Sequence, residues 1–503
     1  MTFPIHFFFI IPVVVWFTLS GEIASGRLEN IPDDDLLDRN PEHIDDARLA
    51  VAIKHQLARV GGNAFSSIEV SVKDGVATLR GTADSLWIQQ RARELSQVIR
   101  GVRGVIDRIS VGPVGSTTDA SLEKYLEAAF FDDPVVELRD IHLEVKRGHV
   151  TLEGRVQSWQ EKQTAVNVAK MVKGVREVRD SLVVRFVNGR ADSDIRKEVA
   201  RRFDFDVWIE SPHLLQVHVQ KGKVSLSGQV RSVYEKNHVG DLAWVEGVRE
   251  VDASEIEVVG MSRDPMIRDR RPMPTDQEIA AAIRMVLDYD PRVSPFKIHV
   301  AVNNGSVILQ GQVPFLSIKR EAEQDAKNTV GVLSVNNQLT VQGNSSLTDR
   351  NIGTRIQALF SRHSVLEKFP LHASVRKGTV VLAGTVNSIY ERNLAENVAS
   401  KIRGVDSIQN HIVFSTKEEE KTDWEIQLDI ENQIWWSAFL SEQDIVATVQ
   451  DGKATLTGSV EYDHQRLIAE QQAFEAGASV VMNRLRVGQF RNSPGSGVHD
   501  RTN

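Results

Sequence analysis

The feature that most constrains the fold is a short segment that recurs six times. The first glycines of the copies are 73, 74, 83, 73 and 74 residues apart. Self-similarity at a fixed period is the signature of tandem structural units. We therefore expect six small domains in two groups of three. Each copy places two glycines around an alternating apolar and polar run: DGVATLRG (74–81), RGHVTLEG (147–154), KGKVSLSG (221–228), NGSVILQG (304–311), KGTVVLAG (377–384) and DGKATLTG (451–458).

The segments around each glycine pair alternate between two kinds of periodicity. An amphipathic run such as DARLAVAIKHQL (46–57) has apolar residues at helical spacing, and Asp46 is placed as its N-cap. A strand with apolar residues at period two follows, then the glycine-flanked strand, a second helical run and a last strand. A helix between two strands is a crossover that places them parallel. The predicted fold class is α+β: each unit is α-β-β-α-β, a three-stranded mixed sheet with two helices on one face.

The paired glycines are interpreted as structural. The first suits a two-residue hairpin turn with positive φ, and in three copies it is the second residue of an Asp-Gly or Asn-Gly pair. The second is expected to end the strand, where a side chain would either clash with a packed neighbour or prevent the bend. A later glycine in five repeats suits a helix C-cap (Gly101, Gly174, Gly247, Gly331 and Gly404). The twelve turn and cap glycines are Gly75, Gly81, Gly148, Gly154, Gly222, Gly228, Gly305, Gly311, Gly378, Gly384, Gly452 and Gly458.

Composition sets broad limits on function. A net charge of −8 argues against a nucleic-acid binder. The absence of cysteine excludes disulfides and cysteine-ligated zinc. Residues 3–19 are almost wholly apolar, which favours a secretory signal, with an uncleaved anchor as the alternative. The expected organisation is a signal or anchor (1–26), a linker (27–45), units at 46–112, 119–187 and 192–259, a Pro/Arg-rich linker acting as a hinge (260–275), units at 276–342, 348–414 and 423–488, and a disordered tail (489–503).

The repeated pattern resembles the BON domain, named for bacterial OsmY and nodulation proteins. The resemblance rests on the V-x-x-G-x-V-x-L-x-G hairpin, as in 219–228, and on the G-V-x-x-V-x-[ND]-x-[LI]-x-V ending, as in 331–341. It implies an α/β unit, a location in the bacterial envelope, and attachment to phospholipid membranes or other envelope components. It also implies links to osmotic stress and to chaperone-like activity, and it brings no catalytic residues. Two units depart from it: the third has one extra residue in its ending, and the sixth has Gly477-Ala478 in place of Gly-Val.

Two sets of residues are candidates for membrane or partner contact. An aromatic residue follows the second glycine in every repeat, and it is either a structural staple at the helix start or an interfacial anchor. Arginines of the central linker suit either a solvated hinge or contact with anionic headgroups. The candidates are Trp87, Trp159, Tyr234, Phe315, Tyr390 and Tyr462, together with Arg268, Arg270 and Arg271. Histidines at one strand position (His142, His299 and His372) are expected to be solvated, so no metal site and no cofactor are predicted.

The pattern therefore predicts an exported, non-enzymatic scaffold that attaches to a phospholipid membrane surface or to envelope proteins. Many weak attachments on one chain would add up to strong binding. No small-molecule substrate is expected, and a serine elbow of the G-x-S-x-G type is absent from the sequence. Two alternatives remain open: a periplasmic chaperone-like protein that binds exported clients, and a ring-building element of a secretion or transport assembly.

Overall fold

The structure is a computed structural model of the 503-residue chain. It describes residues 44–488 except 113–116, 135, 137–139, 186–188, 260–273, 291, 294–295, 343–346, 415–420 and 441–442. The predicted signal or anchor, the C-terminal tail, and the linker arginines Arg268, Arg270 and Arg271 lie outside the described residues.

Each repeat folds as helix, hairpin, helix and strand, in the predicted order. The first helices are α2 (Asp46–Gly61), α4 (Asp119–Asp132), α6 (Asp192–Phe205), α8 (Asp276–Tyr289), α10 (Asp349–Arg362) and α12 (Asp423–Trp436). The hairpins are β1 (Ile68–Lys73) with β2 (Val76–Ala83), β4 (Ile141–Lys146) with β5 (His149–Val156), β7 (Leu215–Gln220) with β8 (Lys223–Val230), β10 (His299–Asn303) with β11 (Ser306–Val313), β13 (His372–Arg376) with β14 (Thr379–Val386), and β16 (Asp444–Gln450) with β17 (Lys453–Val460). The second helices are α3 (Leu86–Gln97), α5 (Trp159–Met171), α7 (Val233–Leu242), α9 (Leu316–Lys327), α11 (Ile389–Ser400) and α13 (Asp463–Glu475). The last strands are β3 (Gly104–Val111), β6 (Glu177–Val184), β9 (Glu250–Val258), β12 (Ser334–Val341), β15 (Ser407–Phe414), β18 (Val480–Asn483) and β19 (Arg486–Val487).

The six sheets share one topology, which confirms the predicted α+β class. The glycine-flanked strand is central in each sheet; it pairs antiparallel with the first strand and parallel with the last. The two irregular repeats differ locally. A register shift between Ser225 and Ser227 accommodates the extra residue of repeat 3. In repeat 6 the last strand is split into β18 and β19, both paired with β17.

The hairpin turn is the same in all repeats. The two central turn residues have positive φ in every copy, for example 52° at Asp74 and 75° at Gly75, as a type I′ turn requires. Asp46 corrects one prediction: it is not the N-cap of α2, because Asp45 accepts the Arg48 N–H at 2.9 Å. The Asp46 carboxylate instead accepts both turn N–H groups, at 2.8 Å each. The same lock joins helix and hairpin in every repeat, through Asp119, Asp192, Asp276, Asp349 and Asp423.

The second glycine lies inside its strand, so the prediction that it ends the strand was wrong. Gly81 pairs with Ile68, and β2 continues for two residues beyond it. A Cβ atom at Gly81 would lie 1.9 Å from the Ser67 carbonyl oxygen. The chain entering the first strand therefore crosses so close to the central strand that only glycine fits.

The glycine after the second helix is not a C-cap, which corrects the sequence interpretation. Helix α3 ends at Gln97, four residues before Gly101, and the backbone between them pairs with another repeat. Ile99 bridges to Ser437 of repeat 6, and Arg100 N–H donates to the Trp436 carbonyl at 2.8 Å. Gly101 still requires glycine, because its φ is 89°.

These backbone bridges pair the two halves of the chain. Besides the bridge between repeats 1 and 6, Val172 pairs with His363 (repeats 2 and 5) and Asp206 pairs with Thr329 (repeats 3 and 4). Each bridge joins the end of one second helix to the end of one first helix. The contact between repeats 1 and 6 therefore recurs between repeats 4 and 3, which is an approximate twofold relation between the halves. Repeats 1–3 and repeats 4–6 therefore contact each other at three interfaces, in addition to being joined through the linker.

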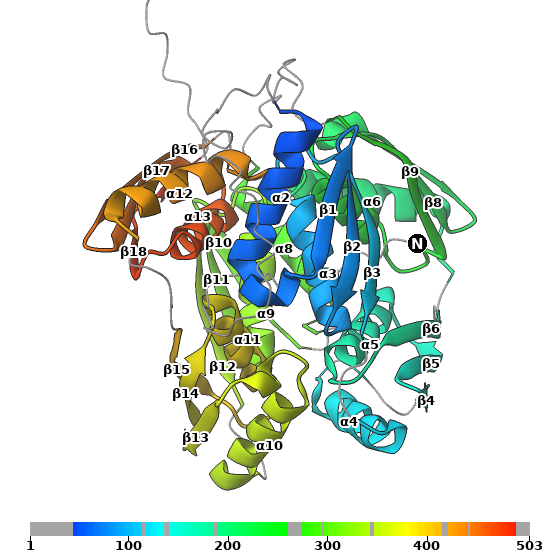
Figure 1. Ribbon diagram of the computed structural model, residues 1–503. Coiled ribbons are helices and arrows are strands. Elements are labelled where there is room, and N and C mark those ends of the chain that lie inside the picture. Colours follow the sequence, from blue (N-terminus) through cyan, green and yellow to red (C-terminus); the bar gives the residue numbers. More distant parts are fainter. Residues whose placement is uncertain are drawn as a thin grey trace, which may run out of the picture.

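The apolar cores also cross repeat boundaries. One cluster joins repeat 1 to repeat 3, and another joins repeat 6 to Trp208 and Tyr234 of repeat 3. Figure 1 shows the sheets of repeats 2, 3, 5 and 6 at the edges of the view, with helices such as α3, α9 and α11 towards the middle. The outer face of each sheet consequently faces solvent, and the helices build the interior of the assembly.

Candidate functional site

The aromatic residues predicted as contact sites lie between the repeats, and none of the six is exposed. Trp159 is stacked on Trp244 of repeat 3, with ring centroids 5.3 Å apart. Trp87 Nε1 of repeat 1 donates to Tyr390 Oη of repeat 5. This placement favours the packing role over the membrane-anchor role for these two repeats.

The other aromatic residues are placed in the same way. Tyr234 packs edge-on against Phe439 of repeat 6, at 5.1 Å. Phe315 lies under the Arg403 guanidinium of repeat 5, at 5.2 Å. Tyr462 stacks on His464 within repeat 6, at 5.7 Å. The recurring aromatic position thus supplies contacts between units in five repeats.

A cavity of about 170 Å³ lies where five repeats meet. Its wall combines aromatic side chains such as Trp87, Phe205 and Tyr289 with amides such as Gln163 and Asn167. Charged groups also line it, including Arg91, Arg202, Asp290, Arg292, Asp325 and Lys401. Enclosed cavities with a few convergent polar groups are the usual form of ligand sites. Polar cavities of this size also hold ordered water, so the shape alone assigns no ligand.

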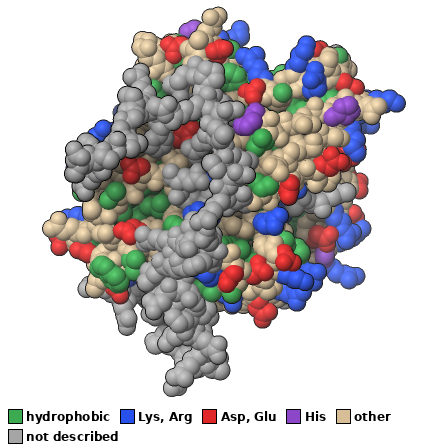
Figure 2. All heavy atoms as spheres, turned by 90° about the horizontal axis from the view of Figure 1, so that it is seen from above, with side chains coloured by type: hydrophobic (Ala, Val, Ile, Leu, Met, Phe, Trp, Pro, Cys, Tyr) green, Lys and Arg blue, Asp and Glu red, His purple; other side chains and the backbone are tan. Residues whose placement is uncertain are grey.

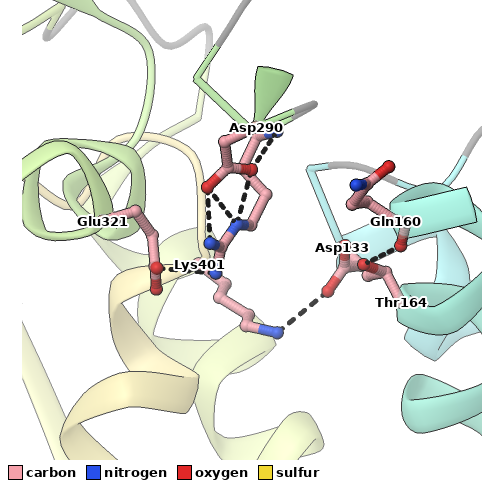
Figure 3. A network of polar contacts seen from close by, with 7 residues as sticks. Asp133, Gln160, Thr164, Asp290, Glu321 and Lys401 are labelled. Carbon is pink, nitrogen blue, oxygen red and sulfur yellow. Dashed lines mark hydrogen bonds and ion pairs between the residues drawn. The ribbon is translucent and has the colours of Figure 1, made fainter. Parts of the chain in front are cut away.

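The charged groups of the cavity form ion pairs, one of them across a repeat boundary and two within repeat 4. Lys401 of repeat 5 donates to Asp133 of repeat 2 at 2.9 Å. Arg292 Nε lies 2.8 Å from the Asp290 carboxylate, and its Nη1 lies 2.6 Å from Glu321. Figure 3 shows Asp290, Glu321 and Lys401 on one side of the network, facing Asp133, Gln160 and Thr164 of repeat 2. Each cation has a carboxylate partner, so the network is suited to holding the repeats in register.

Burial perturbs several of these groups. Burial raises the pKa of Glu321 to about 7, although Arg292 opposes the shift. Burial, reinforced by the Asp290 carboxylate, raises the pKa of Asp325 well above its ordinary value. Burial and the nearby Arg93 lower the pKa of Lys170 to about 8. Perturbed groups often mark functional sites, but ion-pair networks between packed units perturb pKa values equally.

The raised carboxyl pKa values predict a loss of stability between pH 4.5 and about pH 8, which the lowered pKa of Lys170 opposes only above about pH 8. Burial raises the pKa of Glu235 and Glu475 to about 8, and that of Glu391 to about 7. An unfolded chain releases these protons near pH 4.5, so the folded state binds more protons between that pH and about 8. Stability must therefore fall as pH rises, by up to about 1.4 kcal/mol per pH unit for each such carboxyl.

The measurement is the thermal unfolding midpoint between pH 6.5 and pH 8.5. Buried His363 and His464, whose pKa values burial lowers to about 3, add a loss of stability only on the acidic side of this range. Glu475→Gln should flatten the slope, because the amide has no proton to release in this range. Its Oε1 can still accept the hydrogen bond from Gln471 Nε2. Glu69→Gln, on the exposed side of β1, should leave the slope unchanged. An equal slope in both variants would contradict the assignment.

The outer surface carries the remaining candidates. His142, His299 and His372 are exposed on the outer faces of their sheets. Figure 2 shows Lys and Arg interspersed with Asp and Glu on one face of the molecule, and hydrophobic side chains in small groups. Four of the exposed large hydrophobic residues named in the described part of the chain belong to repeat 6: Trp424, Val446, Val480 and Met482.

Sequence reasoning missed two local signals that were present. A Ser-x-x-Glu sequence begins α5, α7 and α11, where the serine hydroxyl accepts the N–H of the glutamate three residues on, as at Ser232 and Glu235. The aspartate that locks the hairpin precedes the turn glycine by 29 or 30 residues in every repeat. The pairing between repeats had no sequence signal of this kind.

The comparisons with known proteins decide the family. A model described as "BON domain" matches six times, at residues 45–113, 118–185, 191–260, 275–343, 348–416 and 422–489. The chain belongs to the BON-domain family. The six matches follow the six structural repeats, and they cover most of the chain.

Relatives match part of this BON-domain protein. It is 30% identical over 141 residues to the osmotically-inducible protein Y of Escherichia coli (strain K12), covering 26% of this chain and 70% of the relative. It is 27% identical over 138 residues to the outer membrane lipoprotein DolP of Haemophilus influenzae, covering 26% of this chain and 71% of that protein. A structure of CdsD, a structural protein of the type III secretion system of Chlamydia trachomatis, is similar at 15% identity with a TM-score of 0.12, over 43% of this chain and 100% of that chain.

Within 44–488 and outside its gaps, none of the helices is both long and apolar enough to cross a bilayer. The same residues contain no cluster of three or more His, Asp or Glu side chains that would hold a metal ion.

Proposed function

We propose that this BON-domain protein is a non-enzymatic, exported scaffold of the bacterial envelope that attaches to a phospholipid membrane surface through repeat 6. Its family and its similarity to an osmotically inducible protein and to an outer-membrane lipoprotein support the envelope location and a role under osmotic or envelope stress. The recurring aromatic residues are internal, so the contact surface must be sought on the outer faces of the sheets.

One observation carries the choice of repeat 6. Its last strand presents Val480, Met482, Arg484 and Arg486 outward in alternation, and all four are exposed. Val446, on the outer face of β16, is 53% exposed. Trp424 lies on α12 rather than on the sheet, and it is 68% exposed. Exposed apolar side chains beside arginines suit an anionic membrane surface, where each basic residue adds about 1 kcal/mol of attraction. Repeats 1 and 2 each place only one exposed apolar residue and one exposed arginine on the last strand, Ile106 with Arg108 and Val183 with Arg179, whereas repeat 6 has two of each.

Sedimentation with liposomes tests the proposal. The chain without residues 1–26 is mixed with neutral or anionic vesicles at low and high salt. We expect binding to anionic vesicles that weakens with salt. Replacement of Trp424 by Gln and of Val446, Val480 and Met482 by Thr should reduce the bound fraction at least about fivefold, since burial of apolar surface drives insertion.

The matched control uses exposed valines of other sheets. Val183→Thr and Val413→Thr change side chains that are each 60% exposed on repeats 2 and 5, and should leave binding unchanged. Equal losses in both sets, or no binding to either kind of vesicle, would remove repeat 6 as the contact surface. Protein clients would then become the favoured partners.

A further inference from the structure

The outer faces of the sheets differ in charge, and those of repeats 4 and 5 carry the fewest charged side chains. Each sheet turns alternate residues of its three strands outward, and the register aligns them in rows across the sheet. In repeat 1 one row is Glu69, Arg80 and Arg108. The equivalent row in repeat 4 is His299, Gln310 and Gln338.

The outer face of the repeat 4 sheet has the fewest charged side chains. None of the outward-facing side chains of β10, β11 and β12 is an Asp, Glu, Lys or Arg, whereas repeats 1, 2 and 3 each place at least four of these on the same face. Most of the outward residues of repeat 4 are amides or hydroxyls, and Ala301 and Ile308 lie in the middle row. The outward set is His299, Ala301, Asn303, Ser306, Ile308, Gln310, Gln312, Ser334, Asn336, Gln338 and Thr340.

The polar groups of this face are held in place by one another. Gln310 Nε2 donates to Gln338 Oε1 at 2.8 Å, and Gln342 Nε2 donates to Gln312 Oε1 at 3.1 Å. Ser334 Oγ donates to Ser306 Oγ at 3.1 Å. Each amide still has a free donor or acceptor after these bonds. Groups that are already ordered lose less conformational entropy when they bind a partner.

The lack of charge and the dimensions of the outer face of the repeat 4 sheet indicate which kind of partner it can bind. Without lysine or arginine the face has no attraction for phosphate headgroups. Three strands about 4.8 Å apart and eight residues at about 3.3 Å make a strip roughly 10 Å wide and 25 Å long. That strip is much smaller than the roughly 800 Å² per partner of a stable protein interface. It is the right shape for a single linear chain, and its amides match dense neutral hydroxyl groups.

We propose that the outer face of the repeat 4 sheet binds an uncharged polyhydroxylated chain, a neutral glycan, laid along its strands. This binding is separate from the lipid contact of repeat 6, because it uses another sheet and no charged group. The glycan's hydroxyls would exchange donors and acceptors with the ordered amides, and Ile308 and Ala301 would contact the apolar side of a sugar ring.

Calorimetric titration of the protein with three neutral pentasaccharides tests this, using the N-acetylated chitin, cellulose and amylose pentamers. We expect at least one to bind, with affinity insensitive to salt. The variant His299→Glu with Gln310→Arg and Gln338→Arg copies the row that repeat 1 already carries, so the fold tolerates it. We expect that variant to bind at least fivefold more weakly.

The reciprocal variant of repeat 1 is the control: Glu69→His with Arg80→Gln and Arg108→Gln must not weaken binding. No binding of any pentasaccharide to the unaltered protein overturns the proposal, and so does equal binding by the repeat 4 variant. A concentration-dependent increase in mass that the repeat 4 variant abolishes would assign the face to a second copy of the chain and also overturn it. The liposome result of repeat 6 is unaffected by any of these outcomes.

Discussion

Gly458→Ala should unfold repeat 6, or cost the protein more than about 4 kcal/mol, because no relaxation removes the clash while the sheet stays paired. A Cβ at this position would lie 1.9 Å from the Asp444 carbonyl oxygen, and the glycine has a φ of 118°. The obstacle is backbone rather than a flexible side chain. Relief requires β16 and β17 to separate where they pair. Unfolding of repeat 6 would be measured by the fluorescence of Trp435 and Trp436, which should no longer change when the variant is heated.

Gly452→Ala in the same hairpin is the matched control. Gly452 has a φ of 68°, but its Cβ would meet only the Ser479 hydroxyl, at 3.4 Å. The expected cost is about 1 kcal/mol, the strain of a left-handed residue, and both turn N–H bonds to Asp423 can remain. Similar costs at the two glycines would contradict the assignment of the second glycine to a close backbone crossing.

The sequence was sufficient for the fold of each unit because that information is local. Alternation at period two placed the strands, and the Asp-Gly and Asn-Gly pairs placed the turns. Repetition extended the turn assignment to Arg147, Lys221 and Lys377, which adopt φ of 49° to 54° although their residue types favour it less. The position of the second glycine was predicted wrongly because a glycine in the sequence is typical both of a strand end and of a close approach between two strands.

The site was less predictable because it is built between units. A recurring aromatic residue looks the same in sequence whether it contacts lipid or a neighbouring repeat. Only the arrangement shows that Trp87 meets Tyr390, which is 303 residues away. Likewise, Glu475 and Asp325 occur in ordinary helical runs, and nothing local indicates that they are buried by other repeats.

The approximate twofold relation explains which residues meet. Arg59 of repeat 1 pairs with Asp429 of repeat 6 at 2.8 Å. At the equivalent positions of repeats 4 and 3, Tyr289 donates to Glu198 at 3.0 Å. The geometry of the contact is kept although the chemistry differs. The two halves have therefore become complementary to each other, and a half paired with its own copy would lose these contacts.

The clearest test of this complementarity is Asp132→Arg at the contact between repeats 2 and 5. Asp132 at the end of α4 accepts from Arg362 at the end of α10, at 2.9 Å, and the two positions are equivalent in their repeats. Both side chains are largely buried. The substitution would place a second guanidinium against Arg362 and near Arg355. Breaking a buried pair in this way costs about 3–5 kcal/mol, which should appear as a lower unfolding midpoint in urea.

The exchanged pair, Asp132→Arg together with Arg362→Asp, separates charge complementarity from general damage. It restores opposite charges across the same contact, so it should recover at least about half of the loss. Arg362→Asp alone should be as harmful as Asp132→Arg, because it sets two carboxylates against each other. Additive losses in the double variant would mean that the pair does not hold the halves together. The neighbouring backbone bridge between Val172 and His363 would then have to supply that cohesion.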